Sequence, residues 1–317
     1  MDLFEKILNR LNGLHFRQEY LCHPSQALDL PLCAYLVSGD RVICDITSRH
    51  HFVGYHPLIF ALDDRDTRSE WLDILFCHGP LPVNAVFRQK DAIAFLKLRR
   101  IPAPVPSFTG IGLYEGVAGG HRFLSPFHQR IVALHNRLYH QKPGNVFLEN
   151  PLYRQVQVAY SVSRHISLVT VAMGGLYNLF PTDLHGPVGD RQYIISLRKG
   201  GKACEQVLTA RTILLSRVEP SFYQTVYALG RNHMQEMKTA EYFPLALDEG
   251  PPIPQHTVSW LELEWQEILS HGIHNLLLFK IINRGGPAGA TDSLCHVHNV
   301  YATWRHNNGL GGNYLLR

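Results

Sequence analysis

The stretch ISLVTVAMGGLYNLFPTDLHGPVGDRQYIISLRKGGKACEQV, residues 166–207, decides the fold that the sequence predicts. It begins as an apolar, β-branched strand, turns at Gly174-Gly175 and passes through a loop of small and polar residues. A second apolar strand leads through Arg198-Lys199-Gly-Gly-Lys202 into a helix. Backbone amides at a helix start, next to arginine and lysine, favour anions. The stretch therefore predicts a strand–loop–strand–helix unit able to hold a phosphate-bearing ligand.

A second informative stretch is GIHNLLLFKIIN, residues 272–283, an apolar strand that opens with glycine, histidine and asparagine. Polar groups at the start of an apolar strand suggest that these residues line the opening of a ligand-binding site. Between and around these two stretches, the alternation and β-branching of the residues predict further strands. Beyond residue 145 we expect strands at 155–162, 166–173, 193–197, 212–218, 256–265 and 276–282, with short helices at 205–208 and 222–229. Many strands, few helices and glycine-rich connections indicate a nearly closed antiparallel barrel.

The first 145 residues mix strand and helix patterns. We expect strands at 31–37, 41–47, 56–62 and 83–87, helices from Asp2, from Thr67 and from Ser125, and a long irregular excursion over 101–120. A weak symmetry relates the halves, because the strands PLIFAL and YIISL are each followed by a helix pattern and a third strand, VNAVF or TILLSRV. An unrelated α+β domain and a degenerate copy of the second half both stay open. We predict domains 1–145 and 146–317.

Composition excludes several classes of protein. Of the 317 residues 45% are hydrophobic and 18% charged, and the net charge of +4 is too mild for a nucleic-acid polymer as partner. No run of 18 apolar residues is present, so we expect no membrane partner. The six scattered cysteines form no CxxC pair and the first residues lack signal-peptide features, so we expect reduced thiols and a cytoplasmic protein.

The order VTV…GGLYN…PTDL…ISL…GGKACE…TILLSRV…LELEWQEI…GIHNLLLFKII…YATWR resembles the flavin reductase-like family of FMN-binding split-barrel proteins, over about residues 150–317. The family includes reductase components of two-component monooxygenases. Two features depart from its pattern: the loop reads NLFPTDL, and Ala203 stands where a threonine commonly follows the lysine. The matching positions are Asn178 and Thr182 in the loop, Ser196-Leu197 at the strand end, Lys202 at the helix start, and Gly272 with His274.

The resemblance implies a mainly β protein with some α: an FMN-binding split β-barrel, preceded by an α+β or degenerate split-barrel-like domain. It implies FMN as cofactor, with FAD as an alternative, and hydride transfer from NAD(P)H. Asn178, Thr182 and Asp183 would lie in the cofactor loop, Ser196, Arg198 and Lys202 would hold the phosphate, and His274 would act at the ring or nicotinamide. Such barrels form homodimers with flavin at the interface, and a tandem copy would make an intramolecular pseudodimer instead.

Simpler roles for these residues remain open. Arg198 and Lys202 could form a solvated helix start, Asn178 a turn, and His274 a structural histidine. Cys295-His-Val-His298 places alternate side chains on one face, but no matching pair completes a metal site, so we expect none. A non-catalytic flavin-binding protein and, less favoured, a haem-binding split barrel are the alternatives to a reductase.

Overall fold

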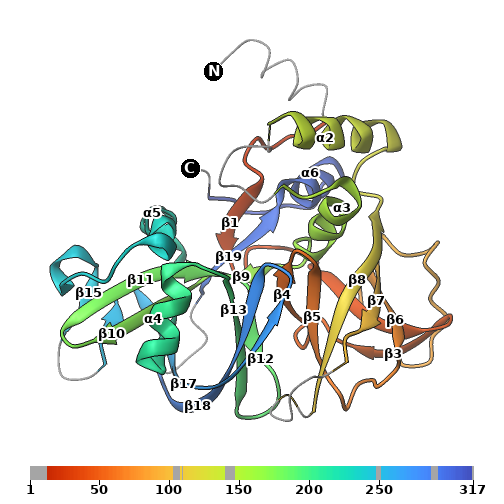
Figure 1. The fold of residues 1–317 in the computed structure, drawn as a ribbon. Helices are drawn as coiled ribbons and strands as arrows, with labels where there is room; N and C mark the ends of the chain where they lie inside the picture. The colour runs from red at the N-terminus through yellow and green to blue at the C-terminus, as the bar shows by residue number, and fades with distance from the viewer. Residues whose placement is uncertain are drawn as a thin grey trace.

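The computed structural model describes residues 13–102, 108, 110–139, 147–247, 251–286 and 292–315 (Figure 1). These residues form two seven-stranded antiparallel sheets that lie side by side, with the helices α2 (Pro126–Tyr139), α3 (Asn150–Ala159) and α6 (Asn299–Asn307) grouped at one end (Figure 1). The predicted fold class, mainly β with some α, is confirmed. The predicted helix from Asp2 lies outside the described residues.

The C-terminal sheet has the strand order β11-β10-β14-β17-β18-β13-β12. Its long β17–β18 hairpin carries register shifts after Glu262 and after Trp265, and such bulges bend a sheet. Helix α4 (Lys202–Ala210) connects β13 to β14 and covers the sheet. The strands are β10 (Ser167–Met173), β11 (Leu176–Thr182), β12 (His185–Pro187), β13 (Gln192–Arg198), β14 (Thr212–Val218), β17 (Thr257–His271) and β18 (His274–Gly285).

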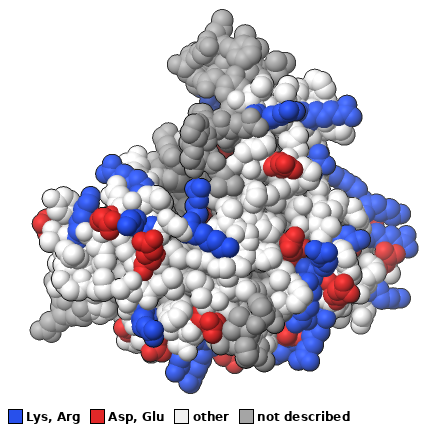
Figure 2. Space-filling model, viewed as in Figure 1, with Lys and Arg blue, Asp and Glu red and all other residues white. Residues whose placement is uncertain are grey.

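The N-terminal sheet has the strand order β3-β2-β6-β7-β8-β5-β4. Along β7, Leu96 and Leu98 are buried while Lys97 and Arg99 face solvent over the exposed ring of Trp71. Basic side chains gather over this sheet in Figure 2, with acidic side chains among them. The strands are β2 (Leu32–Ser38), β3 (Arg41–Asp45), β4 (His51–Tyr55), β5 (Leu58–Asp63), β6 (Trp71–His78), β7 (Ala94–Arg100) and β8 (Ile111–His121).

The two sheets have the same topology. Replacing β2 to β8 in order by β10, β11, β12, β13, β14, β17 and β18 converts one strand order into the other. The predicted equivalence of PLIFAL and YIISL therefore matches the pair β5 and β13. The partner of TILLSRV (β14) is β6, however, and the helix α4 has no counterpart between β5 and β6.

The two halves share a hydrophobic core. Strands β13 and β18 are buried on both faces, which explains why they read as continuous apolar runs rather than alternating ones. Alternate residues such as Ile195 and Leu277 face the core of the C-terminal sheet, whereas Ile194 and Leu278 face the other half. The shared core is completed by Val53, Ile59, Ala61, Phe108, Ile111, Leu113, Val188, Leu269 and Leu276.

Residues beyond the predicted domain boundary also pack onto the N-terminal sheet. Helix α3 (Asn150–Ala159) and helix α6 (Asn299–Asn307) bury Val156 and Tyr301 in the core of that sheet. The first and last strands pair with each other in the small sheet β1-β19-β9. These strands span β1 (Tyr20–Pro24), β9 (Arg164–His165) and β19 (Leu294–His298). The boundary between residues 145 and 146 stays a prediction.

The helix predicted over 125–138 is present as α2 (Pro126–Tyr139), and that around 222–229 as α5 (Tyr223–Ala228). Short 3-10 turns surround α5, and a two-stranded ribbon follows it. These elements are η2 (Pro220–Phe222), η3 (Leu229–Met234), η4 (Ala240–Tyr242), β15 (Leu245–Ala246) and β16 (Ile253–Pro254).

Five local predictions are wrong. The loop expected after Gly174-Gly175 contains the strands β11 and β12. Residues 155–162 belong largely to helix α3, whose first turn carries a proline, and not to a strand. The segment from Thr67 contains strand β6 rather than a helix, because its apolar run is a central strand paired on both sides. The excursion 101–120 contains β8, and residues 83–87 form a turn with a single bridge from Arg41 to Val86.

Candidate functional site

A cavity of 280 Å³ lies where the two halves meet. It is formed by the end of β11, the end of β13, the first residue of β18 and the N-terminus of α4, together with Tyr55 at the end of β4 from the other half. We call it the interhalf pocket. Its lining comprises Tyr55, Pro181, Thr182, Asp183, Leu184, Ser196, Leu197, Arg198, Gly201, Ala203, Cys204, His233, Met234 and His274.

Five of the predicted site residues come together there: Thr182, Asp183, Ser196, Arg198 and His274. The reason is the register of two neighbouring strands, because Arg198 on β13 lies directly opposite His274 on β18. Thr182 ends β11 and Asp183 follows it, and the chain then continues into β12 at the edge next to β13.

His274 is buried, with 2% of its surface exposed, and neither ring nitrogen has a hydrogen-bond partner among the described residues. Its ring meets Tyr55 edge-on, with 4.6 Å between the ring centroids. Burial lowers the pKa of His274 to about 4, an effect that Asp183 opposes and Arg198 reinforces. The imidazole is therefore neutral near pH 7, and it can donate one hydrogen bond to a ligand and accept one from it.

Ser196 adds a second polar group without a partner. Its hydroxyl is buried and makes no hydrogen bond to any residue that the structure describes, while its backbone N–H donates to Leu184 O at 2.8 Å. Because unpartnered buried polar atoms are rare in folded proteins, a hydroxyl and an imidazole converging on one cavity mark a place for a polar ligand.

Asp183 is anchored on the side away from solvent. Its carboxylate accepts a hydrogen bond of 2.7 Å from Tyr160 Oη and pairs with His296 Nε2 at 2.8 Å. Burial alone would raise the pKa of this carboxyl, but His296, Tyr160 and Arg164 together hold it well below its usual range. The Asp183 carbonyl also accepts from Arg164. Asp183 is thus an ionised anchor of the loop that carries Thr182.

The positive end of the pocket consists of Arg198 and the start of α4. Gly201 caps the helix, and its N–H lies 3.2 Å from the carbonyl oxygen of Arg198. The N-terminal amides of a helix of nine residues carry partial positive charge that attracts anions. Ala203, which replaces the expected threonine, is buried against the core and offers no hydroxyl.

Two predicted site residues do not line the pocket. Asn178 is fully buried on β11, where its amide nitrogen donates to Gln206 Oε1 at 2.6 Å and to Asn232 O at 3.1 Å. Lys202 lies on the exposed side of α4, with Nζ 3.0 Å from Glu236 and 3.6 Å from Glu205. Asn178 therefore holds Gln206 and Asn232 in place without lining the pocket. The charge of Lys202 is partly compensated by Glu236 and Glu205, outside the pocket.

Sequence reasoning did not find Tyr55, His233 or Cys204. Tyr55 comes from the other half of the chain, and burial raises its pKa, so its hydroxyl stays protonated. His233 is held by Pro181 O at 2.8 Å and lies against Phe180. None of these residues belongs to a local motif. The tandem symmetry was the one signal that pointed to a wall from the first half.

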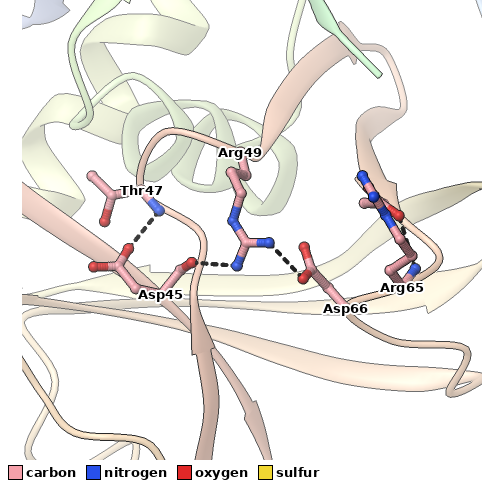
Figure 3. A network of polar contacts seen from close by, with 6 residues as sticks. Asp45, Thr47, Arg49, Arg65 and Asp66 are labelled. Atoms are coloured by element: carbon pink, nitrogen blue, oxygen red, sulfur yellow. Dashed lines mark hydrogen bonds and ion pairs between the residues drawn. The ribbon is translucent and has the colours of Figure 1, made fainter. Parts of the chain in front are cut away.

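The equivalent position in the N-terminal half is different. A cavity of 170 Å³ there is lined by Ser48, Arg49, Asp63 and Arg65, with Gly189 from the opposite half. Figure 3 shows the polar network of this region: Arg49 pairs with Asp66 at 2.7 Å, and Arg65 pairs with Asp63 at 2.5 Å. Asp63 ends β5 where Arg198 ends the equivalent β13. In this half the acidic Asp63 thus stands where the other half has the cation Arg198. The nearby Arg49 and Arg65 are already ion-paired.

The remaining features, a larger cavity and the possible metal ligands, do not bring the predicted site residues together. A larger cavity of 660 Å³ around Trp260 and Arg284 is lined by none of the predicted site residues. Within the described ranges, no group of three or more His, Cys, Asp and Glu side chains could hold a metal ion, and the cysteines are all free thiols. No described helix is both long and apolar enough to span a membrane.

No protein-family model and no curated protein matches this chain. Among solved structures, an FMN-binding protein from Thermus thermophilus has 18% identity and a TM-score of 0.39, covering 43% of this chain and 86% of its own. The NADH:FAD oxidoreductase of Streptomyces globisporus has 15% identity and a TM-score of 0.41, covering 50% and 96%. The styrene monooxygenase flavin reductase of Pseudomonas putida has 14% identity and a TM-score of 0.40, covering 51% and 99%.

The predicted resemblance is thus confirmed at the level of structural neighbours, which include flavin reductases and FMN-binding proteins and align with about half of this chain. The identities are low and the TM-scores lie below 0.5. The function is therefore argued from the site residues themselves.

Proposed function

We propose that this chain is a flavin-binding oxidoreductase that holds FMN in the interhalf pocket, with FAD as the alternative flavin. One observation supports this most strongly: the buried, unpartnered groups of Ser196 and His274 line the same cavity as Arg198 and the start of α4. A flavin has hydrogen-bonding atoms along one ring edge and a phosphate at the end of its side chain. The pocket combines polar groups for the former with a cation for the latter.

The roles follow from the type of each group. Arg198, Ser196 and the N-terminal amides of α4 would hold the phosphate, and Thr182 with the amides of its loop would face the ring. His274, neutral near pH 7, would donate or accept a hydrogen bond beside the ring without adding charge. Bound flavin supplies the hydride chemistry, with NAD(P)H as the proposed donor. Asn178 would act by holding Gln206 and Asn232 in place.

The first test is a visible absorbance spectrum of the purified protein, followed by FMN titration monitored by flavin fluorescence. We expect saturable binding that Arg198→Gln weakens by about tenfold or more, since a charge-assisted hydrogen bond contributes about 1.5–3 kcal/mol. Lys202→Gln is the matched control, because it removes a neighbouring cation that is already paired with Glu236. We expect it to change the affinity by less than about twofold.

Failure of both FMN and FAD to bind would overturn the proposal. Equal losses in the two variants would place the phosphate on the solvent side of α4 instead. A Soret band in the first spectrum would favour the haem alternative.

A non-catalytic flavin-binding protein is the second candidate. It is favoured by Ala203, which stands in the pocket where the family commonly has a hydroxyl. Anaerobic mixing of the FMN-loaded protein with NADH or NADPH separates the candidates. Bleaching of the flavin absorbance supports the reductase, and stable absorbance supports the binding protein.

A further inference from the structure

A second cavity between the halves, with a volume of 390 Å³, differs in character from the interhalf pocket. We call it the arginine–histidine cavity. Its polar lining includes Arg164 and Arg217 and the histidines His50, His51, His165 and His185, and no carboxylate lies among its lining residues. A cavity whose lining contains two cations and no carboxylate is complementary to an anion.

The two arginines differ in how fully they are engaged. Arg164 is buried, and its guanidinium donates to Phe52 O and to Asp183 O, both at 2.8 Å. It therefore joins the two halves. Arg217, near the end of β14, lines both this cavity and the 660 Å³ cavity, and its side chain makes no hydrogen bond or ion pair with any residue that the structure describes. A guanidinium fork with unused donors matches a carboxylate or phosphate group.

His185 supplies the second donor. It is 5% exposed, and its Nδ1 lies 2.8 Å from Tyr193 Oη, whereas Nε2 has no partner among the described residues. Burial raises the pKa of Tyr193 to about 12, so its hydroxyl is protonated and can donate to Nδ1. When Tyr193 donates to Nδ1, the proton of the neutral His185 ring lies on Nε2, which is then a buried N–H without an acceptor among the described residues. Such a group is costly unless a ligand satisfies it.

Apolar residues also line the cavity: Leu28, Leu32, Val162 and Pro187. Burial, together with the nearby Arg164, lowers the pKa of His51 and of His165 to about 3. These rings are therefore neutral, and the positive charge of the cavity comes from its arginines.

We propose that the arginine–histidine cavity binds a small organic anion, with its carboxylate or phosphate group on Arg217 and His185 Nε2 and its apolar body against Leu28 and Val162. This site is separate from the proposed flavin site, although the two are adjacent in the chain: residues 182–184 line one cavity and residues 185–187 line the other. The inference does not depend on flavin binding.

Calorimetric titration of the full chain tests it, in a buffer without carboxylates or phosphate. The probes are benzoate and phenyl phosphate, with inorganic phosphate and neutral benzyl alcohol for comparison. We expect at least one of the organic anions to bind saturably, and at least about tenfold more tightly than either comparison compound. Arg217→Gln should weaken that binding by about tenfold or more, whereas Arg198→Gln, in the other cavity, should leave it unchanged.

Three results would overturn the proposal: no saturable binding of either organic anion, equal affinity in wild type and Arg217→Gln, or loss of binding in Arg198→Gln alone. The last would mean that the probes enter the interhalf pocket. Inorganic phosphate binding as tightly as the organic anions would contradict the role of the apolar lining residues. Because the Arg217 residue is exposed, its substitution should leave the fold intact even if a change at the buried His185 does not.

Discussion

At the scale of single residues, His274 shows a conflict between stability and binding. An unsatisfied buried polar group costs about 1–3 kcal/mol of folding free energy. His274 has two such nitrogens and lines the interhalf pocket. A residue that is unfavourable for the unliganded fold, yet faces a cavity, fits a role in ligand contact.

We therefore expect His274→Leu to leave the thermal unfolding midpoint of the unliganded protein unchanged or higher, while weakening FMN binding by about tenfold. Differential scanning calorimetry without flavin and a fluorescence titration with flavin measure the two effects. His256→Leu is the control for the flavin affinity, because His256 is exposed, pairs with Glu219, packs against Phe222 and does not line the interhalf pocket. A lower midpoint with unchanged affinity would make His274 a structural residue.

At the scale of secondary-structure elements, the turn between β17 and β18 joins the two halves. Gly272 has φ +56°, and a Cβ on it would lie 2.1 Å from the carbonyl oxygen of His56 in the N-terminal half. That carbonyl accepts a hydrogen bond of 3.1 Å from Ile273 N. The polar start of the strand GIHN is thus explained: its glycine fits against the other half, and its histidine lines the pocket.

Gly272→Ala should consequently destabilise the protein more than Gly174→Ala. Both glycines have similar positive φ values, but a Cβ at Gly174, φ +59°, would meet no atom within 4 Å. The control should cost about 1 kcal/mol from backbone strain, and Gly272→Ala more than about 2 kcal/mol because the halves must separate locally. Urea unfolding gives both values. Equal destabilisation by the two substitutions would show that the contact between the halves can accommodate the added Cβ without further loss of stability.

Helix α3 shows why a local prediction of secondary structure failed. The run QVQVAYSV alternates like a strand, yet its segment is helix α3, because β8 provides a surface for it. That surface needs Gly116 and Gly119, where a Cβ would lie within 3 Å of Gln155 on the helix. Short apolar runs fit either periodicity, so the long-range contact decides.

At the scale of the whole molecule, the identical topology of the two sheets makes the chain resemble two joined copies of one unit. The first half supplies Tyr55 to a pocket built mainly by the second half. At the equivalent position the first half carries the ion pairs of Asp63 and Asp66 (Figure 3). The two halves therefore differ in chemistry.

We expect one flavin per chain, in a protein that needs no second chain to complete the site. Light scattering coupled to size exclusion gives the mass of the flavin-loaded species, and the titration end point gives the stoichiometry. Two flavins per chain would mean that a second flavin binds at the equivalent position of the N-terminal half and displaces its ion pairs. Binding that appears only as the chains dimerise would restore the homodimer alternative.

Stability should fall steeply with acid. Burial lowers the pKa of His23, His50, His121 and His274 to about 4, against an unfolded value near 6.5. Since these folded values are depressed, the unfolded chain binds more protons below pH 6.5, and stability is full above that pH and lost as pH falls toward 4. Each histidine contributes a slope of up to about 1.4 kcal/mol per pH unit.

Urea unfolding at pH 7.5, 6 and 5 measures this loss. His121→Gln should reduce the slope by up to about 1.4 kcal/mol per pH unit, because one titrating group is removed. A free energy of unfolding that stays constant between pH 7.5 and 5 would contradict the buried neutral state of these rings.

The sequence by itself determined the strands β10 and β13, the helix α4 and most other strands of the second half. Those features follow from periodicity and turn glycines, which are local, whereas the resemblance to a known family pointed to five residues that line the interhalf pocket. Only the tertiary structure decided that Tyr55 closes the pocket, that Lys202 faces Glu236 and that the halves share a topology. These depend on contacts between residues distant in the chain, where burial and charge pairing override the preference of each segment.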